Sequence, residues 1–100
     1  MTVKLLALYK QPEDEAGFMD HYENVHAPLA RKVPGLEKLV VNKVTGAPGG
    51  DPELFLVAEM HFPNRATFQM AMASEENRAA GEDLMRFAKG LVTILFAEER

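Results

Sequence analysis

The sequence predicts an α+β fold in which four strands form one antiparallel sheet with the helices on one face, in the order βαββαβ. Three observations support this prediction. Segments rich in aliphatic residues alternate with segments whose apolar residues repeat at helical spacing. Turn-forming pairs such as Pro-Gly, Gly-Gly and Pro-Asn separate these segments. The 100 residues, 47% of them hydrophobic and 26% charged, suit one globular domain, which we expect to span residues 1–100.

The chain begins with a predicted strand and a predicted helix. Residues 3–9 are rich in aliphatic side chains, and Gln11-Pro12 ends the strand. From Asp14 the pattern is helical, because apolar residues recur at i, i+4, i+7 and i+11, namely Phe18, Tyr22, Val25 and Leu29. Pro28 lacks a backbone donor and clashes with the carbonyl of Asn24, so we expect the helix to kink or end there and to resume as a short turn.

A β-hairpin is predicted next. Pro34-Gly35 closes the helical segment, and residues 36–45 alternate in the manner of a strand. Residues 46–52 are rich in glycine and proline, which indicates a long turn, and residues 54–62 form the third strand beyond it.

Two helices and a last strand complete the order. Asn64 is a suitable N-cap for a helix over residues 65–73, and Ser74 for a second helix that ends near Gly90. Residues 91–97 form the fourth strand. The resulting order is the ferredoxin-like plan, with the helices on one face of an antiparallel sheet.

The first and fourth strands are apolar on both faces, whereas a sheet with one open face should be polar on that side. The two faces of the first strand carry Val3, Leu5 and Ala7 opposite Leu6 and Leu8, and those of the fourth carry Val92, Ile94 and Phe96 opposite Leu91, Thr93 and Leu95. The helices cover only one face, so the sequence predicts a homodimer in which a second copy covers the other.

Composition excludes several classes of function. The net charge of −4 disfavours nucleic acid as a partner. The longest apolar runs are far shorter than the roughly 20 residues of a membrane span, so we expect no membrane partner. The chain has no cysteine, which excludes disulfides and thiolate chemistry. With no recognisable signal peptide, the expected location is the cytoplasm.

Several motifs resemble one known family along almost the whole chain. The first is Phe18-x-x-His21-Tyr22-x-x-x-His26-x-Pro28-Leu29, followed by Pro34-Gly35-Leu36, Glu59-Met60-His61-Phe62 and Ala73-Ser74-Glu75. They are similar to the signature of EthD-like proteins, named for a bacterial ether-degradation operon. The resemblance implies a dimeric α/β barrel, in which two ferredoxin-like sheets face each other. Relatives in that superfamily include cofactor-free monooxygenases, isomerases, cyclases and haem-handling enzymes, so fold alone does not choose a function.

His26 is the first candidate for chemistry. It lies just before Pro28, where regular helical bonding is lost, and at the edge of the predicted apolar face. A histidine that titrates near neutral pH can act as an acid, a base or a substrate anchor. The structural alternative is that His26 bonds a carbonyl left free by Pro28 and so fixes the bend. His21, on the opposite edge of this face, is expected at the surface or half-buried.

Four other residues are weaker candidates. Glu59 and His61 point the same way from the third strand and could form an acid/base pair, or a solvated or intersubunit ion pair. Tyr9 and Tyr22 could contact a substrate, with simple packing as the alternative. His21 and His26 are five residues apart, which does not match the i, i+4 spacing of a helical metal pair, and no glycine-rich loop joins a strand to a helix. We therefore expect no metal and no cofactor.

Two hypotheses for function follow, and both place a small apolar organic ligand between helices and sheet. The first, favoured by the enzymes among the superfamily relatives, is a cofactor-free oxidoreductase or isomerase that acts on an apolar or aromatic compound in catabolism, with His26 in proton transfer. The second is a non-catalytic binding or accessory protein. Composition does not separate them, since both need an apolar cavity with few polar groups.

Overall fold

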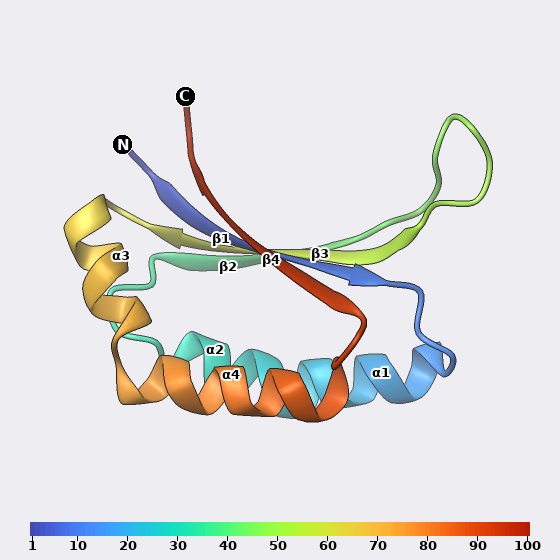
Figure 1. The fold of residues 1–100 in the computed structure, drawn as a ribbon, viewed down its shortest axis with the longest axis horizontal. Helices are drawn as coiled ribbons and strands as arrows, with labels where there is room; N and C mark the ends of the chain where they lie inside the picture. The colour runs from blue at the N-terminus through green and yellow to red at the C-terminus, as the bar shows by residue number, and fades with distance from the viewer.

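Four antiparallel strands form one sheet, and the helices lie against one of its faces (Figure 1). The computed structural model describes all 100 residues. The strand order is β2-β3-β1-β4, so the predicted α+β, ferredoxin-like arrangement is confirmed. The elements are β1 (Val3–Lys10), α1 (Glu15–His21), η1 (Tyr22–His26), α2 (Ala27–Arg31), β2 (Lys38–Lys43), β3 (Leu54–Phe62), α3 (Arg65–Met72), α4 (Glu75–Phe87) and β4 (Val92–Glu98).

The first helical segment departs from the prediction at its centre. Residues of η1 form a π-helix, in which the backbone N–H of Ala27 donates to the carbonyl of Tyr22, five residues earlier. The extra residue in this turn rotates Val25 outward, where 42% of it is exposed, and brings His26 into the buried face at 8%. The predicted apolar stripe is therefore wrong beyond Tyr22.

Pro28 does not end the helix, which is a second correction. It lies in the first turn of α2, directly after the π turn, where its fixed φ suits a helix and the loss of one backbone donor is tolerated. The chain stays helical through η1 and α2, and the irregularity expected near Asn24 takes the form of the π-helix.

The remaining boundaries follow the sequence closely. The side chain of Asn64 accepts from the backbone N–H of Thr67 at 2.8 Å, and that of Ser74 from Asn77 at 3.1 Å, which confirms both predicted caps. The strand β3 spans the predicted residues, whereas β2 is shorter than the predicted 36–45 and β4 is shifted by one residue. A register shift opposite Tyr9 and Lys10 turns Phe55 into the core beside Leu56.

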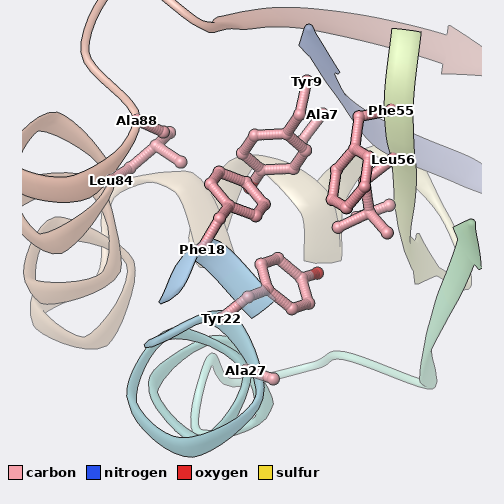
Figure 2. Close-up of a cluster of buried hydrophobic side chains, with 10 residues drawn as sticks. Ala7, Tyr9, Phe18, Tyr22, Ala27, Phe55, Leu56, Leu84 and Ala88 are labelled. Carbon is pink, nitrogen blue, oxygen red and sulfur yellow. The ribbon is translucent and has the colours of Figure 1, made fainter. Parts of the chain in front are cut away.

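An aromatic cluster forms one half of the core, between the sheet and the helices (Figure 2). Phe18 is its centre, with ring centroids 5.4 Å from Tyr9, 5.7 Å from Phe55 and 6.4 Å from Tyr22. The pairs with Tyr9 and Phe55 are edge-to-face and the pair with Tyr22 is stacked, and aromatic pairs of these kinds add about 0.5–1.5 kcal/mol each beyond burial of their area. The second half of the core surrounds Phe62 and Phe68. The aromatic half fixes α1 and η1 on the sheet through Phe18 and Tyr22, and so determines where His26 lies.

The other face of the sheet is covered by no helix (Figure 1). The strand register places a row of apolar side chains there, each half-buried except Leu95, which is 47% exposed: Leu6, Leu8, Val40, Val57 and Leu95. We call this surface the open face. No helix of the chain is long and apolar enough to cross a membrane.

Candidate functional site

A cavity of about 230 Å³ lies between the covered face of the sheet and the helical layer. Small residues on both sides leave this space, with Ala7 and Ala58 on the sheet facing Ala30 and Ala80 on the helices. Thirteen of its sixteen lining residues are hydrophobic, with the two tyrosines counted among them. The polar side chains in its wall are those of Tyr9, Tyr22, His26 and Asn77. Three of the sequence candidates therefore meet in one apolar cavity.

His26 is held in this wall by a buried carboxylate. Its Nδ1 lies 3.0 Å from Oδ2 of Asp83, a residue of α4 that is 2% exposed. The ring also packs against Phe87 and Tyr22, with centroids 5.0 Å and 5.6 Å away. A carboxylate only accepts hydrogen bonds, so Nδ1 carries the proton and Nε2 keeps its lone pair. This is the tautomer that a general base requires.

The environment of His26 keeps its imidazole neutral. Burial lowers its pKa below the usual 6.5, and the nearby His21 acts in the same direction. The hydrogen bond and the negative charge of Asp83 raise the pKa, but they only partly offset the burial. His26 is therefore an unprotonated, oriented imidazole at neutral pH.

Tyr9 and Tyr22 supply two hydroxyl groups to the same cavity. Both residues are buried, at 1% and 2% exposure, and neither hydroxyl bonds another group of the chain. Every fully buried polar side-chain atom of the chain has a hydrogen-bond partner. The two tyrosine oxygens have none, so part of their surface is still accessible, and both residues line the cavity. The Tyr22 hydroxyl extends away from its helix toward the sheet (Figure 2).

Burial also keeps both hydroxyls protonated. It raises the pKa of Tyr22 to about 12, although the positive charge of Arg31 acts the other way. Burial likewise raises the pKa of Tyr9, further assisted by Tyr22 and by the negative charge of Asp83. The two side chains can therefore donate hydrogen bonds to a ligand over the whole physiological pH range.

Sequence reasoning missed Asp83 and the role of His21 beside it. His21 Nε2 lies 2.9 Å from Oδ1 and 3.1 Å from Oδ2 of Asp83, and His21 lines an outer groove rather than the cavity. One signal was present: Asp83 falls between Ala80, Leu84 and Phe87, the apolar face of its own helix, where a charge is unexpected unless it is paired. The other signal was hidden, because only the π-helix brings histidines five residues apart to one partner.

Glu59 and His61 lie on the open face, away from the cavity. Oε1 of Glu59 lies 3.0 Å from His61 Nε2, and Oε2 accepts a hydrogen bond from Asn42 at 3.0 Å. Desolvation raises the pKa of Glu59, but His61, Asn42 and the charge of Lys4 together outweigh it and hold the pKa below its usual value. Glu59, His61 and Lys4, whose Nζ lies 3.6 Å from Oε1 of Glu59, form an ion-pair cluster separate from His26. No three acidic, histidine or cysteine side chains are arranged to hold a metal ion.

The fold agrees with what the chain matches. The protein-family model for the EthD domain matches residues 10–90. The chain belongs to the EthD family. An uncharacterized 11.0 kDa protein from the thcB-thcC intergenic region of Rhodococcus erythropolis is 32% identical over 96 residues, which are 96% of this chain and 93% of that protein. A solved EthD family protein from Bacillus halodurans is 45% identical, with a TM-score of 0.96 over all of both chains. The resemblance identified from the motifs is thus confirmed.

More distant structures share only the fold with this EthD protein. A hydroxynitrile lyase from Passiflora edulis is 12% identical with a TM-score of 0.77, over 99% of this chain and 94% of that one. SnoaB, a cofactor-independent oxygenase from Streptomyces nogalater, is 15% identical with a TM-score of 0.69, over 99% and 93%. A protein from Jannaschia described as dimeric and ferredoxin-like is 18% identical with a TM-score of 0.73, over 99% and 100%.

Proposed function

We propose that this EthD protein is an enzyme that transfers a proton on a small, neutral, largely apolar organic compound, with His26 as the base. It is a cofactor-free isomerase or oxidoreductase. The observation that carries the proposal is the buried His26–Asp83 pair, at 3.0 Å, in the wall of an apolar cavity that also holds two protonated tyrosines. A buried carboxylate that orients an imidazole toward a cavity is more than packing requires.

The cavity restricts the ligand. Its lining has no Lys, Arg, Asp or Glu, so a charged ligand would lose its hydration without gaining a counter-charge. An engineered cavity of about 150 Å³ holds benzene. The 230 Å³ of this cavity therefore suits a ring with a few substituent atoms. One ligand oxygen, as a carbonyl or hydroxyl group, would pair with the Tyr9 and Tyr22 hydroxyls.

Proton abstraction follows from this placement. Nε2 of His26 takes a proton from a carbon next to the ligand carbonyl, so that a C–H bond breaks and an N–H bond forms. The electron pair moves to the ligand oxygen, where the tyrosine hydroxyls donate hydrogen bonds to the developing charge. Asp83 stabilises the imidazolium that results. Return of the proton to another carbon completes an isomerisation. Reaction of the anion with dioxygen would instead form a carbon–oxygen bond and reduce dioxygen to a peroxide, which takes the proton from His26 to give a hydroperoxide.

Two of the distant structures support an enzyme of this kind at the level of fold, since one is a lyase and the other a cofactor-independent oxygenase. The alternative is a protein that binds the same class of compound without converting it. It needs the apolar cavity but not the oriented imidazole, so the His26–Asp83 pair favours catalysis. The expected cytoplasmic location stays a prediction.

The test begins with the compound that the protein retains. Mass spectrometry of the gently purified protein should identify a neutral compound about as large as a ring with a few substituent atoms. Incubation of that compound with the protein in D₂O should then introduce deuterium at one carbon. Replacement of His26 by Gln should slow this exchange about 10²–10⁴-fold. The His61→Gln variant, changed on the other face of the sheet, should exchange at the wild-type rate. A bound compound that never exchanges would instead make the chain a binding protein.

A second copy of the chain is the partner we propose for the open face. The exposed apolar side chains of that face would be covered, and the ion-pair cluster of Glu59, His61 and Lys4 would lie between two sheets. Dimeric relatives of the same fold support this arrangement. The cavity lies on the opposite side of the sheet, so each copy would keep its own site.

A further inference from the structure

Asp83 lies between two histidines rather than one. Its Oδ2 is 3.0 Å from Nδ1 of His26, and its Oδ1 is 2.9 Å from Nε2 of His21. The ring of Phe87 packs on both imidazoles, with centroids 4.6 Å from His21 and 5.0 Å from His26. With Asp83 itself 2% exposed, the carboxylate has little contact with water and its charge acts mainly on these two rings.

The two histidines differ in their access to solvent. His26 faces the internal cavity, whereas the side chain of His21 is 32% exposed and lines an outer groove. The acidic residues Glu13 and Asp14 line the same groove. His21 can thus exchange protons with water while His26 exchanges them with a ligand.

We propose that His21 is a positioning residue that sets how readily His26 accepts a proton, through the Asp83 carboxylate that both rings share. This inference deepens the proposed function, because it gives the proposed base a built-in control by pH. It concerns the protonation of two side chains of the free protein, so it can be tested without a ligand.

The coupling follows from the shared charge. When His21 is neutral, the full negative charge of Asp83 faces His26 and stabilises its imidazolium form. When His21 is protonated, it neutralises much of that charge, and its own positive charge opposes a second one nearby. A protonated His21 therefore keeps His26 in its neutral, basic form as the pH falls. The lowered pKa of His26, to which His21 contributes, agrees with this direction.

Other charged or titratable groups near the pair do not change in the same pH range. Tyr22 packs on His26 and Tyr9 lines the same cavity, but burial keeps both phenols protonated. Arg31, which acts on Tyr22, carries a fixed positive charge. Glu13 and Asp14 line the same groove as His21, and the Asp14 carboxylate accepts a hydrogen bond from the backbone N–H of Gly17. The two histidines are thus the pair of rings that share the Asp83 carboxylate.

The experiment is a titration of the histidine rings by NMR. The chain has only three histidines, so each ring can be assigned. The His21→Gln variant keeps an amide donor for Asp83 but cannot take up a charge. In that variant the titration midpoint of His26 should rise by about half a unit to one unit. His61→Gln is the matched control and should leave it unchanged. A His26 midpoint that stays the same in His21→Gln would overturn the proposal.

The wild-type protein gives an independent decision if the variant does not fold. Coupled groups titrate in two steps, so the chemical shift of the His26 ring plotted against pH should show a second inflection caused by the protonation of His21. A simple one-site curve for His26 would rule the coupling out. If the exchange reaction of the proposed function is found, the acid limb of its pH profile should shift upward in His21→Gln by the same amount as the midpoint. If no reaction is found, the proposed function fails while the titration still decides the role of His21.

Discussion

The ring of His26 contacts the buried carboxylate of Asp83 and also lines an apolar cavity. The helical pattern placed His26 at the edge of the apolar face and Tyr22 within it, and Tyr9 ends the first predicted strand, so these three could be found from the sequence. Asp83 could not be assigned to them, since its partners lie 57 and 62 residues away in the chain. Contacts of that range depend on how α4 packs against η1, which local periodicity does not contain.

Replacement of His26 by Gln separates the site hypothesis from the structural one. The Gln amide can still donate to Asp83, so the free energy of unfolding should fall by only about 1 kcal/mol. Ligand binding or turnover should fall far more, by about 10²–10⁴-fold. Denaturant unfolding and binding measured on the same variant check this. A large loss of stability with normal binding per folded molecule would make His26 structural.

The lowered pKa of His26 predicts a loss of stability in mild acid. The folded protein holds this imidazole below the pKa of 6.5 that it has when unfolded, so the unfolded chain binds more protons in that range. The free energy of unfolding has its full value, as far as His26 is concerned, above about pH 6.5, and it declines as the pH falls toward the pKa of His26 in the folded protein. Denaturant unfolding between pH 5 and 8 should show this decline in the wild-type protein. The curve of His26→Gln should be flatter, and equal slopes in the two proteins would contradict the assignment.

At the scale of an element, η1 is the part of the fold that the sequence misrepresents. An α-helical period places Val25 inward and His26 at the edge, but the single π turn reverses them. A π-helix is locally unfavourable and persists only where the surrounding packing requires it. Here the aromatic cluster holds Tyr22 and Asp83 holds His26, and both constraints come from other elements. The strands and caps, which depend on local signals, were predicted nearly in full.

A pair of substitutions tests the π turn directly. Val25→Gln should cost less than about 0.5 kcal/mol, because the side chain is 42% exposed. Ala27→Gln should cost about 2 kcal/mol or more, because that residue is 3% exposed and the longer amide has no room or partner. Chemical denaturation of both variants measures the difference. The regular helical pattern predicts that Val25 is the more sensitive position, so that ranking would exclude the π turn.

At the scale of the molecule, the sheet divides the chain into two chemically different halves. The covered face holds the cavity and the proposed base, whereas the open face holds apolar residues around the cluster of Glu59, His61 and Lys4. The apolar residues on both faces of the first and last strands predicted from the sequence that the face without helices would also be apolar. It could not reveal which polar residues share a side with His26, because that depends on the π turn and on α4.

The proposed homodimer would follow from this division, and its test uses the most exposed apolar residue of the open face. Light scattering at micromolar concentration should give twice the 11.1 kDa chain mass. Leu95 is 47% exposed and pairs with Leu6 of the neighbouring strand β1, so Leu95→Lys would place a charge in the proposed apolar interface. That variant should dissociate at concentrations where the wild type is paired.

Met70→Lys is the matched control for this change, since Met70 is 70% exposed on α3, outside the open face. It should keep the wild-type mass, because a lysine there remains in water in either state. A wild-type monomer would remove the need for a covered face. A dimer that survives Leu95→Lys would place the interface elsewhere, because a buried unpaired ammonium group next to apolar side chains costs several kcal/mol of association free energy. Only loss of the dimer in Leu95→Lys alone assigns the contact to the open face and leaves the two cavities on the outer sides of the pair.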